Sequence, residues 1–322
     1  MKTRVIGIDI GGTKVAAGIV DQKGKILEKA FYPTMAGKGL KDSLNQVYLS
    51  IEQMISRGMP DGSMFEGIGV CAPGPLDPLS GIVHNPPNLK GWKNVPLRDL
   101  LEKRFKKPVK VENDANAAAM AEHKWGSAMG YRHILYVTVS TGIGTGILID
   151  GKIYHGKNGM AGEGGHVTIN YDDNEAVCVC GTPGCIEKLA SGVATSKKLA
   201  AKIGRGDVKG ASRIKKACGG KLEDLDMRII GDAALSGDRL AISTIREQGT
   251  LIGIWLGGMI SVLDPEIIVI GGGVSLLGQL LLDPIRKTIP RNTINTFASR
   301  TPVVAAKLSR DVGIYGAASI MF

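Results

Sequence analysis

The sequence predicts an α/β fold with two similar lobes. Short apolar runs typical of buried strands, such as residues 5–10 and 266–270, alternate with segments of helical periodicity, such as residues 41–57. The 45 glycines, about twice the usual share for 322 residues, cluster directly after the apolar runs. A strand-and-turn pattern from the start of the chain also recurs near its middle. Alternating strands and helices, arranged in two related halves, predict two α/β lobes around a cleft.

The internal repeat relates the N-terminal segment to a later one. In the first copy, a strand over 5–10, a glycine turn and a strand over 15–20 follow one another. In the second copy, a strand over 134–139, a glycine-rich turn over 140–146 and a strand over 147–149 do the same. Each copy then turns through aspartate and glycine into a Lys-Ile pair. Two copies of one supersecondary unit indicate a duplicated core.

Periodicity and capping residues predict the other elements. Residues 41–57 carry apolar side chains at helical spacing, and residues 115–125 are rich in alanine, the strongest helix former. Asn113 and Asp114 directly precede that second segment, where side-chain oxygens cap a helix. The further elements are strands over 67–71, 109–112 and 266–270, helices over 187–203 and 239–263, and a helix that follows the glycines 271–273 and runs to about Lys287.

Composition excludes several classes of protein. A chain that is 43% hydrophobic and 22% charged is too apolar to be disordered, and no apolar run reaches the roughly 18 residues of a membrane helix. Asp9 interrupts the first apolar run, so we expect no secretion signal and a cytoplasmic protein. The net charge of +10 is scattered along the chain, which favours attraction of anionic small molecules over nucleic acid.

Three glycine-rich turns each follow a predicted buried strand, and such turns expose backbone N–H groups that bind phosphate. One turn alone is equally consistent with a simple tight turn, whereas three in one chain favour a nucleotide. The chain has no P-loop motif, and a dinucleotide-like Gly-x-Gly-x-x-Ala over 67–72 is followed by Pro73 where a helix should begin. The candidate phosphate ligands are Asp9, Gly11, Gly12, Thr13 and Lys14 in the first turn, Thr141, Gly142 and Gly144 in the second, and Gly272 and Gly273 in the third.

A candidate catalytic group follows the strand predicted over 109–112. Residues 112–116 read Glu-Asn-Asp-Ala-Asn and lie where that strand gives way to a helix, a usual place for catalytic groups in open α/β sheets. An ionised Asp114 is suited to accept the proton of a substrate hydroxyl there, while Asn113 hydrogen-bonds the substrate. The alternative is that both side chains only cap the helix.

The most specific local pattern is one histidine followed by three closely spaced cysteines, namely His166, Cys178, Cys180 and Cys185. One imidazole and three thiolates complete a tetrahedral zinc site without an open position, so we expect a structural ion. Three core thiols without a metal are the alternative. An odd total of five cysteines also fits a reducing compartment better than a disulfide framework. No ligand-like spacing, and so no special role, is expected for His84, His123, His133 and His155.

Together and in this order, these segments resemble the family of repressors, open reading frames and sugar kinases, and within it the glucokinase-like members. The family's diagnostic motifs, Glu-x-Gly-His and Cys-x-Cys-Gly-x-x-Gly-Cys-x-Glu, stand intact as residues 163–166 and 178–187. The resemblance runs from Asp9 to residues 311–318. One departure is Gly164, because the family usually carries a bulky apolar residue at that position. This departure bears on which sugar is preferred.

The resemblance implies a two-lobed actin-like and hexokinase-like fold, of the ribonuclease H-like class, with sugar and nucleotide in a central cleft. It implies a small domain over 1–117, to which a C-terminal helix over about 309–322 returns. The large domain would then span 118–308 and carry the zinc loop. Because the family's proteins are commonly dimers or tetramers, a homo-oligomer is expected. Neither a membrane nor a nucleic acid is expected as a partner.

The resemblance also assigns roles to matching positions. Asp114 is expected to be the general base of a sugar kinase that uses ATP and Mg²⁺. His166 is expected to bind zinc through one ring nitrogen and sugar through the other, so that the metal fixes a substrate ligand. The three turns are expected to hold the phosphates, Mg²⁺ and the adenosine side of the nucleotide. The implied sugar ligands are Asn113, Asp114, Glu163, His166 and Glu187, with Gly74 in a loop that borders the sugar.

The implied function is an ATP-dependent hexose kinase, with D-glucose as the first choice of substrate. Kinases for N-acetylmannosamine, N-acetylglucosamine, mannose or fructose share the same hydroxyl ligands and stay open as alternatives. A sugar-sensing repressor is disfavoured, because only eight residues precede Asp9 and a helix-turn-helix domain needs many more. A polyphosphate-dependent glucokinase is disfavoured because that subgroup generally lacks the cysteine cluster.

Overall fold

The chain folds into two compact units. The computed structural model describes residues 3–58, 65–173, 177–178, 180–308 and 310–322. The units themselves are unit 1, made of Met1–Tyr136, Gly146–Gly162 and Lys307–Phe322, and unit 2, made of Val137–Thr145 and Glu163–Ala306. The first division thus falls after Tyr136 and not after residue 117. The helix that follows residue 113 belongs to unit 1 because it packs against the C-terminal helix of that unit.

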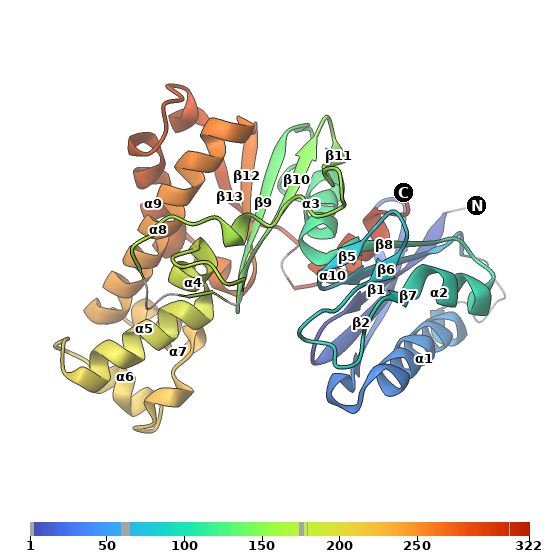
Figure 1. Ribbon diagram of the computed structural model, residues 1–322, viewed down its shortest axis with the longest axis horizontal. Helices are drawn as coiled ribbons and strands as arrows, with labels where there is room; N and C mark the ends of the chain where they lie inside the picture. The colour runs from blue at the N-terminus through green and yellow to red at the C-terminus, as the bar shows by residue number, and fades with distance from the viewer. Residues whose placement is uncertain (1–2, 59–64, 174–176, 179, 309) are drawn as a thin grey trace. The chain divides into compact units, whose positions relative to one another are not determined.

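Unit 1 is built on one five-stranded sheet (Figure 1). Its strands are β1 (Arg4–Ile10), β2 (Lys14–Asp21), β3 (Ile26–Pro33), β4 (Ile68–Ala72) and β8 (Val109–Asn113). The order is β3-β2-β1-β4-β8, with β4 parallel to both β1 and β8. The strands predicted in this unit are therefore confirmed. Because β1, β4 and β8 run in parallel, Ile10, Ala72 and Asn113 end at the same edge of the sheet. A smaller antiparallel sheet consists of β5 (Leu76–Asp77), β6 (Ile82–Val83) and β7 (Val95–Pro96).

Helices cover both faces of the first sheet. They are α1 (Leu40–Gly58), α2 (Leu97–Phe105), α3 (Asp114–Trp125) and α10 (Val312–Ser319). α1 packs on β1, β2 and β3 through Val47, Ile51 and Met54, which recur at helical spacing and are fully buried. α10 packs on β1 and β4, where a Cβ at Gly7 or Gly69 would overlap the helix backbone. Glycine at these two positions therefore lets α10 lie directly against the sheet.

The second sheet also has five strands. They are β9 (Ile134–Val139), β10 (Ile143–Ile149), β11 (Lys152–Ile153), β12 (Ile267–Gly271) and β13 (Val303–Ala305). The order is β11-β10-β9-β12-β13, and the division between the units runs through β9 and β10. The turn predicted over 140–146 is wrong in its extent, because β10 already begins at Ile143. Gly146 marks no turn: a Cβ there would overlap the carbonyl oxygen of Ala115 in α3.

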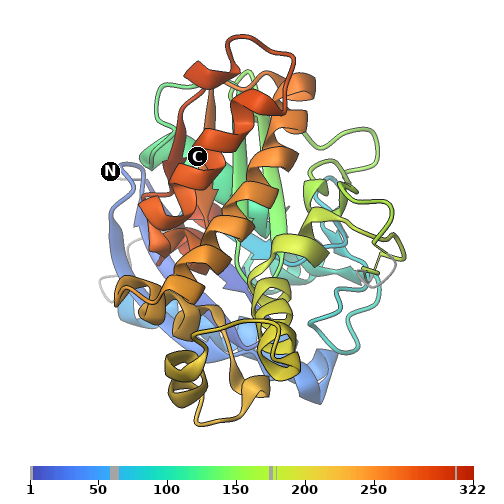
Figure 2. The ribbon, with the colours of Figure 1, turned by 90° about the vertical axis from the view of Figure 1, so that its left-hand side faces the viewer.

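The helices of unit 2 pack in a layer of their own (Figure 2). They are α4 (Ile186–Ala190), α5 (Gly192–Arg205), α6 (Ser212–Ala217), α7 (Met227–Leu235), α8 (Arg239–Leu263) and α9 (Gln279–Thr288). The single helix predicted over 187–203 is wrong, because Ser191 adopts an extended conformation and caps α5 by accepting from the N–H of Ala194. A 3₁₀-helix (Gly273–Leu277) likewise precedes α9. No helix within the described ranges is long and apolar enough to cross a membrane.

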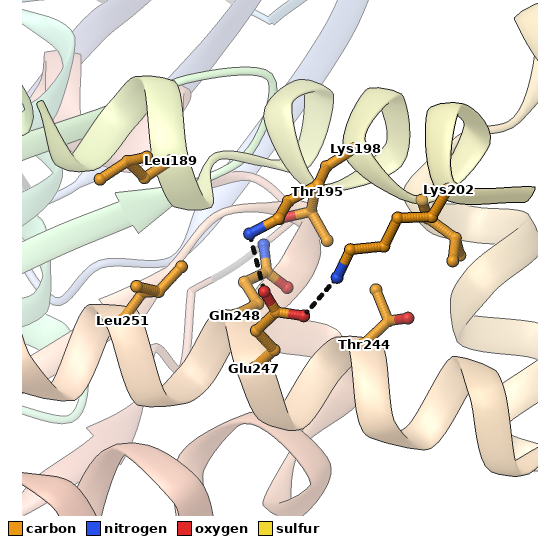
Figure 3. Close-up of a pocket in the computed structure, with 9 residues that line it drawn as sticks. Leu189, Thr195, Lys198, Lys202, Thr244, Glu247, Gln248 and Leu251 are labelled. Atoms are coloured by element: carbon orange, nitrogen blue, oxygen red, sulfur yellow. Dashed lines mark hydrogen bonds and ion pairs between the residues drawn. The ribbon is translucent and has the colours of Figure 1, made fainter. Parts of the chain in front are cut away.

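A small pocket between α5 and α8 is filled by side chains of both helices (Figure 3). Glu247 accepts hydrogen bonds from Lys198 at 2.7 Å and from Lys202 at 3.2 Å. Gln248 donates to the carbonyl oxygen of Ala190 at 2.9 Å and thereby holds the end of α4. The cavity volume of about 20 Å³ is enough for a single water. This pocket is therefore a structural contact and not a ligand site.

Candidate functional site

The strand-to-helix junction after β8 presents Asp114 at the edge where the parallel strands end. Asn113 caps α3, because its Oδ1 accepts from the N–H groups of Ala115 at 2.9 Å and Asn116 at 3.3 Å. Asp114 is the first residue of the helix, and its Oδ1 accepts from Ala115 at 2.8 Å. Asn113 is therefore the residue that caps α3. The amide NH₂ of Asn113 has no hydrogen-bond partner within the ranges that the structure describes, so it is available to a ligand.

Glu112 and His155 support this junction, and the sequence analysis missed both. Glu112 is 4% exposed, and its Oε1 accepts from the backbone N–H of Asn113 at 2.9 Å and from Nδ2 of Asn116 at 3.1 Å. Its Oε2 pairs with Nε2 of His155 at 2.7 Å. The hydrogen bond from Glu112 raises the pKa of His155. The expectation that His155 has no special role is therefore wrong.

The first glycine-rich turn joins β1 to β2. Its shape is fixed by hydrogen bonds from the N–H of Gly11 to the carbonyl oxygen of Lys14 at 2.9 Å and from Thr34 Oγ1 to the carbonyl oxygen of Gly11 at 2.6 Å. Gly12 and Thr13 are exposed at its tip. Lys14, at the start of β2, places its ammonium group 4.9 Å from the centre of the Phe31 ring. The turn therefore offers backbone and hydroxyl donors on an exposed edge.

Asp9 is the next-to-last residue of β1, just before this turn. Burial, together with the negative charge of Asp114, raises the pKa of Asp9 to about 7, and Lys14 only partly opposes that shift. Asp114 itself is exposed, and a carboxyl group that is raised in pKa by burial and by a neighbouring negative charge is stabilised in its ionised form by a cation. Asp9 and Asp114 therefore form the part of unit 1 that is best suited to a divalent metal beside a phosphate.

The second turn lies in unit 2 and carries Thr141 and Gly142. Glu187, near the start of α4, accepts from the N–H of Ile143 at 3.0 Å through its Oε2. A Cβ at Gly142 would overlap that same oxygen. The phosphate turn and the predicted sugar ligand Glu187 are thus in direct contact. Gly144, predicted in the turn, instead lies inside β10.

A large cavity in unit 2 has a volume of about 700 Å³, within the range of small-molecule sites. It brings together Thr141 of the second turn, Gly273 of the third turn and the N-terminal part of α5 at Gly192. Gly272 lies just behind it with a φ of 81°, against the carbonyl oxygen of Val139. Sequence reasoning missed the apolar side of this cavity, because its residues share no motif. That side includes Val193, Met227, Leu276 and Leu277.

The Glu-x-Gly-His segment forms a 3₁₀-helix (Gly164–His166) that begins after Glu163. The N–H of Gly164 donates to Thr145 Oγ1 at 3.1 Å. A Cβ at position 164 would lie 2.8 Å from that oxygen and 3.3 Å from Cζ2 of Trp255. Thr145 and the indole of Trp255, which is 2% exposed, therefore together occupy the space that a larger residue at 164 would need.

The four predicted zinc ligands lie together in unit 2. The donor atoms of His166, Cys178, Cys180 and Cys185 are all within 4.8 Å of one another. His166 Nδ1 lies 3.5 Å from Cys178 Sγ, and its Nε2 lies 3.9 Å from Glu163 Oε2. Zinc bonds of about 2.0–2.3 Å in a tetrahedron place ligand atoms roughly 3.3–3.8 Å apart, so this donor set fits zinc. One imidazole nitrogen faces the cysteines, and the other faces a predicted sugar ligand.

Gly74 lies in the segment between β4 and β5, which is held by a hydrogen bond from the N–H of His84 to the carbonyl oxygen of Pro75 at 2.9 Å. Unit 1 therefore carries Asp9, the first turn, Gly74, Asn113 and Asp114. Unit 2 carries the second and third turns, Glu163, Glu187 and the cysteine cluster. The predicted site residues thus fall into two groups, and each group lies within one unit.

Comparison with known proteins identifies the family. A sequence model of the ROK family matches residues 5–322. The chain belongs to the ROK family. The glucokinase of Thermotoga maritima is 36% identical over 99% of this chain and 98% of its own length. The structure of a ROK glucokinase from Streptomyces griseus, in complex with glucose and AMPPNP, matches with a TM-score of 0.84 and 34% identity over 98% of both chains.

The ROK family also contains regulators, and this chain matches some of them. The xylose repressor of Caldicellulosiruptor bescii is 32% identical over 88% of this chain and 69% of the repressor. The solved structures nevertheless confirm the predicted actin-like and hexokinase-like α/β fold. The family and the fold are therefore established. The distinction between a kinase and a regulator rests on the catalytic residues.

Proposed function

We propose that this ROK protein is an ATP-dependent hexose kinase that converts D-glucose and ATP to glucose 6-phosphate and ADP. The observation that carries the proposal is Asp114, a carboxylate at the ends of the parallel strands whose helix is already capped by Asn113. The likeness to glucokinases of Thermotoga maritima and Streptomyces griseus over nearly the whole chain supports glucose and ATP as substrates.

In the proposed reaction, Asp114 accepts the proton of the sugar 6-hydroxyl. The freed oxygen forms a bond to the γ-phosphorus while the bond from that phosphorus to the bridging oxygen breaks and leaves ADP. The NH₂ group of Asn113 donates to a neighbouring hydroxyl. Glu112 keeps both residues in place, because its Oε1 holds the N–H of Asn113. Glu163, His166 and Glu187 hydrogen-bond the remaining sugar hydroxyls.

The phosphates are held by the N–H groups and hydroxyls of the first two turns, and the cavity beside Gly273 takes the adenosine. Mg²⁺, when bound, neutralises phosphate charge. Asp9 is the residue of unit 1 that would hold it, since the buried carboxyl beside Asp114 gains most from a cation. Lys14 lies over Phe31 and would have to leave that ring to reach a phosphate.

A structural zinc ion on His166, Cys178, Cys180 and Cys185 completes the proposal. Four protein ligands leave no position for a reacting water, so the ion supplies rigidity and not chemistry. It would hold the ring of His166 at a fixed angle, with Nε2 turned toward Glu163. A cytoplasmic location agrees with the free cysteines among the described residues. A homo-oligomer, either a dimer or a tetramer, is also proposed, because proteins of this family commonly form one.

Glucose selectivity is tested by the release of ADP from the purified protein across a panel of sugars. Glucose should give the highest kcat/KM, ahead of mannose, fructose, N-acetylglucosamine and N-acetylmannosamine. A much higher kcat/KM with an N-acetylated hexosamine would overturn glucose as the substrate. Binding of a sugar without ADP release from any of them would instead favour the sugar-sensing role of the family's repressors.

Replacing Gly142 with alanine should raise the KM for glucose about tenfold. The new Cβ displaces Oε2 of Glu187 from the N–H of Ile143 and so misplaces a sugar ligand, and one hydrogen bond to a charged group is worth roughly 1.5–3 kcal/mol. The matched control is Gly204→Ala in α5, where the nearest atom to a Cβ is 3.9 Å away. Steady-state kinetics of both variants decide, and an unchanged glucose KM for Gly142→Ala would remove Glu187 from the sugar ligands.

A further inference from the structure

A second cavity lies entirely in unit 1, beside the free edge of β8. Its volume is about 420 Å³. β8 is the last strand in the order of its sheet, and residues 109–112 form one wall. The other walls include residues of α3, of β11 and, near the C-terminus, Ser319, Ile320 and Phe322. None of the turns assigned to ATP lines it, so its role is separate from the proposed function.

Positive charge dominates this cavity. Four cationic side chains line it: Arg98, Lys110, Lys124 and Lys152. Arg98 donates to the carbonyl oxygen of Leu79 at 2.7 Å, and Lys110 donates to that of Ile320 at 2.8 Å, so each is held by a hydrogen bond to the backbone. Arg98 also lies 3.5 Å from Asp99, whose side chain is 66% exposed.

Lys124 and Lys152 have no partner within the part of the chain that the structure describes. No ion pair or side-chain hydrogen bond of either residue is formed there. Lys124 is half-buried, and burial together with the charge of Lys110 lowers the pKa of Lys124. Lys110 and Lys152 are exposed. A half-buried cation such as Lys124, close to other cations, is stabilised by a bound anion.

The single carboxylate in the wall cannot serve as that anion. Glu112 is already engaged through both oxygens, by His155 on one side and by Asn113 and Asn116 on the other. Glu112 Oε2 lies 2.7 Å from His155 Nε2, and this hydrogen bond raises the pKa of His155. The charge of the cavity is therefore set by its lysines and arginine.

The remaining lining is apolar and suits the body of an organic ligand. It consists of Ile153, Ile320 and Phe322, with Met120 from α3. We propose that this cavity is a second ligand site that binds a small phosphate monoester of sugar size, with the phosphate between Lys124 and Lys152. A volume of about 420 Å³ lies within the range of small-molecule sites.

A ligand bound in this cavity is expected to affect the catalytic junction at Asn113 and Asp114 through Glu112. This residue belongs to the cavity wall, and its Oε1 also holds the backbone N–H of Asn113, next to Asp114. A bound ligand that attracts or repels the Glu112 carboxylate can therefore alter kcat through the hydrogen bond between Glu112 and Asn113. This regulatory part rests on the proposed function, whereas binding itself does not.

Binding is tested on the full chain by isothermal titration with ribose 5-phosphate and with inorganic phosphate, in the presence of saturating glucose and AMPPNP. Trp125 provides a second readout, because its ring lies 5.9 Å from that of Phe322, which lines the cavity. The variants are Lys124→Met, Lys152→Met and the double variant that combines them. Methionine keeps the apolar stem of each lysine side chain. Lys103→Met, at an exposed position of α2, is the matched control.

We expect ribose 5-phosphate to bind the wild type and the control equally, and to bind the double variant at least tenfold more weakly. Tighter binding of the ester than of inorganic phosphate identifies an organic ligand, whereas equal affinities identify free phosphate as the occupant. No binding at 20 mM, or equal binding by the double variant, would overturn the site. Binding without any change in kcat would overturn only the link to catalysis. Since titration needs no turnover, these outcomes are independent of whether the protein is a kinase.

Discussion

Asp114→Asn should lower kcat by on the order of 10²- to 10⁴-fold, the usual contribution of a general base. The amide keeps the size of the side chain and an oxygen that can accept from Ala115, as Oδ1 of Asp114 does now. It cannot take up the proton of the sugar hydroxyl. The KM for glucose should therefore stay within about threefold, because sugar binding does not need that proton transfer.

Thermal unfolding and glucose titration of the same variant separate catalysis from folding. Because Asn113 supplies the cap of α3, the Tm of Asp114→Asn should remain close to that of the wild type. Asn113→Ala is the contrasting variant: loss of the cap costs about 1 kcal/mol and should lower the Tm. A kcat for Asp114→Asn within about threefold of the wild type would mean that Asp114 acts only at the helix terminus.

Cys180→Ser should abolish zinc binding, lower the Tm and raise the KM for glucose at least tenfold. The wild type should contain about one zinc per chain by elemental analysis, since four donor atoms converge within 4.8 Å. Loss of the ion frees His166, whose other nitrogen faces Glu163 at 3.9 Å, so two sugar ligands loosen together. The KM for ATP should change much less, because no residue of the cluster belongs to the two phosphate turns or lines the cavity proposed for the adenosine.

The matched control for the zinc variant is Cys218→Ser, a buried cysteine in the same unit whose thiol donates to the carbonyl oxygen of Lys215. It should retain zinc and an ordinary glucose KM. Wild-type protein that holds less than about 0.2 zinc per chain, yet phosphorylates sugar at its full rate, would reduce the cluster to packed thiols.

Most of the features predicted correctly were read from short, local sequence patterns. Strands such as β1 and β4 are short apolar runs bounded by glycine, and Asn113 has the chemistry of a helix cap, so each could be read from a few neighbouring residues. The convergence of the predicted zinc ligands was predictable for the same reason, because short spacing brings Cys178, Cys180 and Cys185 together. The ROK family and its fold followed from these motifs and are confirmed by comparison.

Contacts between distant residues were not predictable. Glu112 and His155 are 43 positions apart, and no spacing rule links a histidine in a loop to a carboxylate in a strand. The break at Ser191 was missed because periodicity continues across it, whereas the backbone is decided by one serine that caps α5. The glycine at 146 was taken for a turn, although it serves the approach of α3 to β10.

The fit between Gly164 and Trp255 has a consequence for how this protein can change during descent. A side chain at 164 would meet Thr145 Oγ1 at 2.8 Å and Cζ2 of Trp255 at 3.3 Å, whereas a smaller residue at 255 would leave a void while glycine stays at 164. The effects of substitutions at 145, 164 and 255 are therefore expected to be non-additive, because side chains at the three positions share one space. A bulky residue placed at 164 alone should destabilise this protein, and only compensating changes at both 145 and 255 would make room for it.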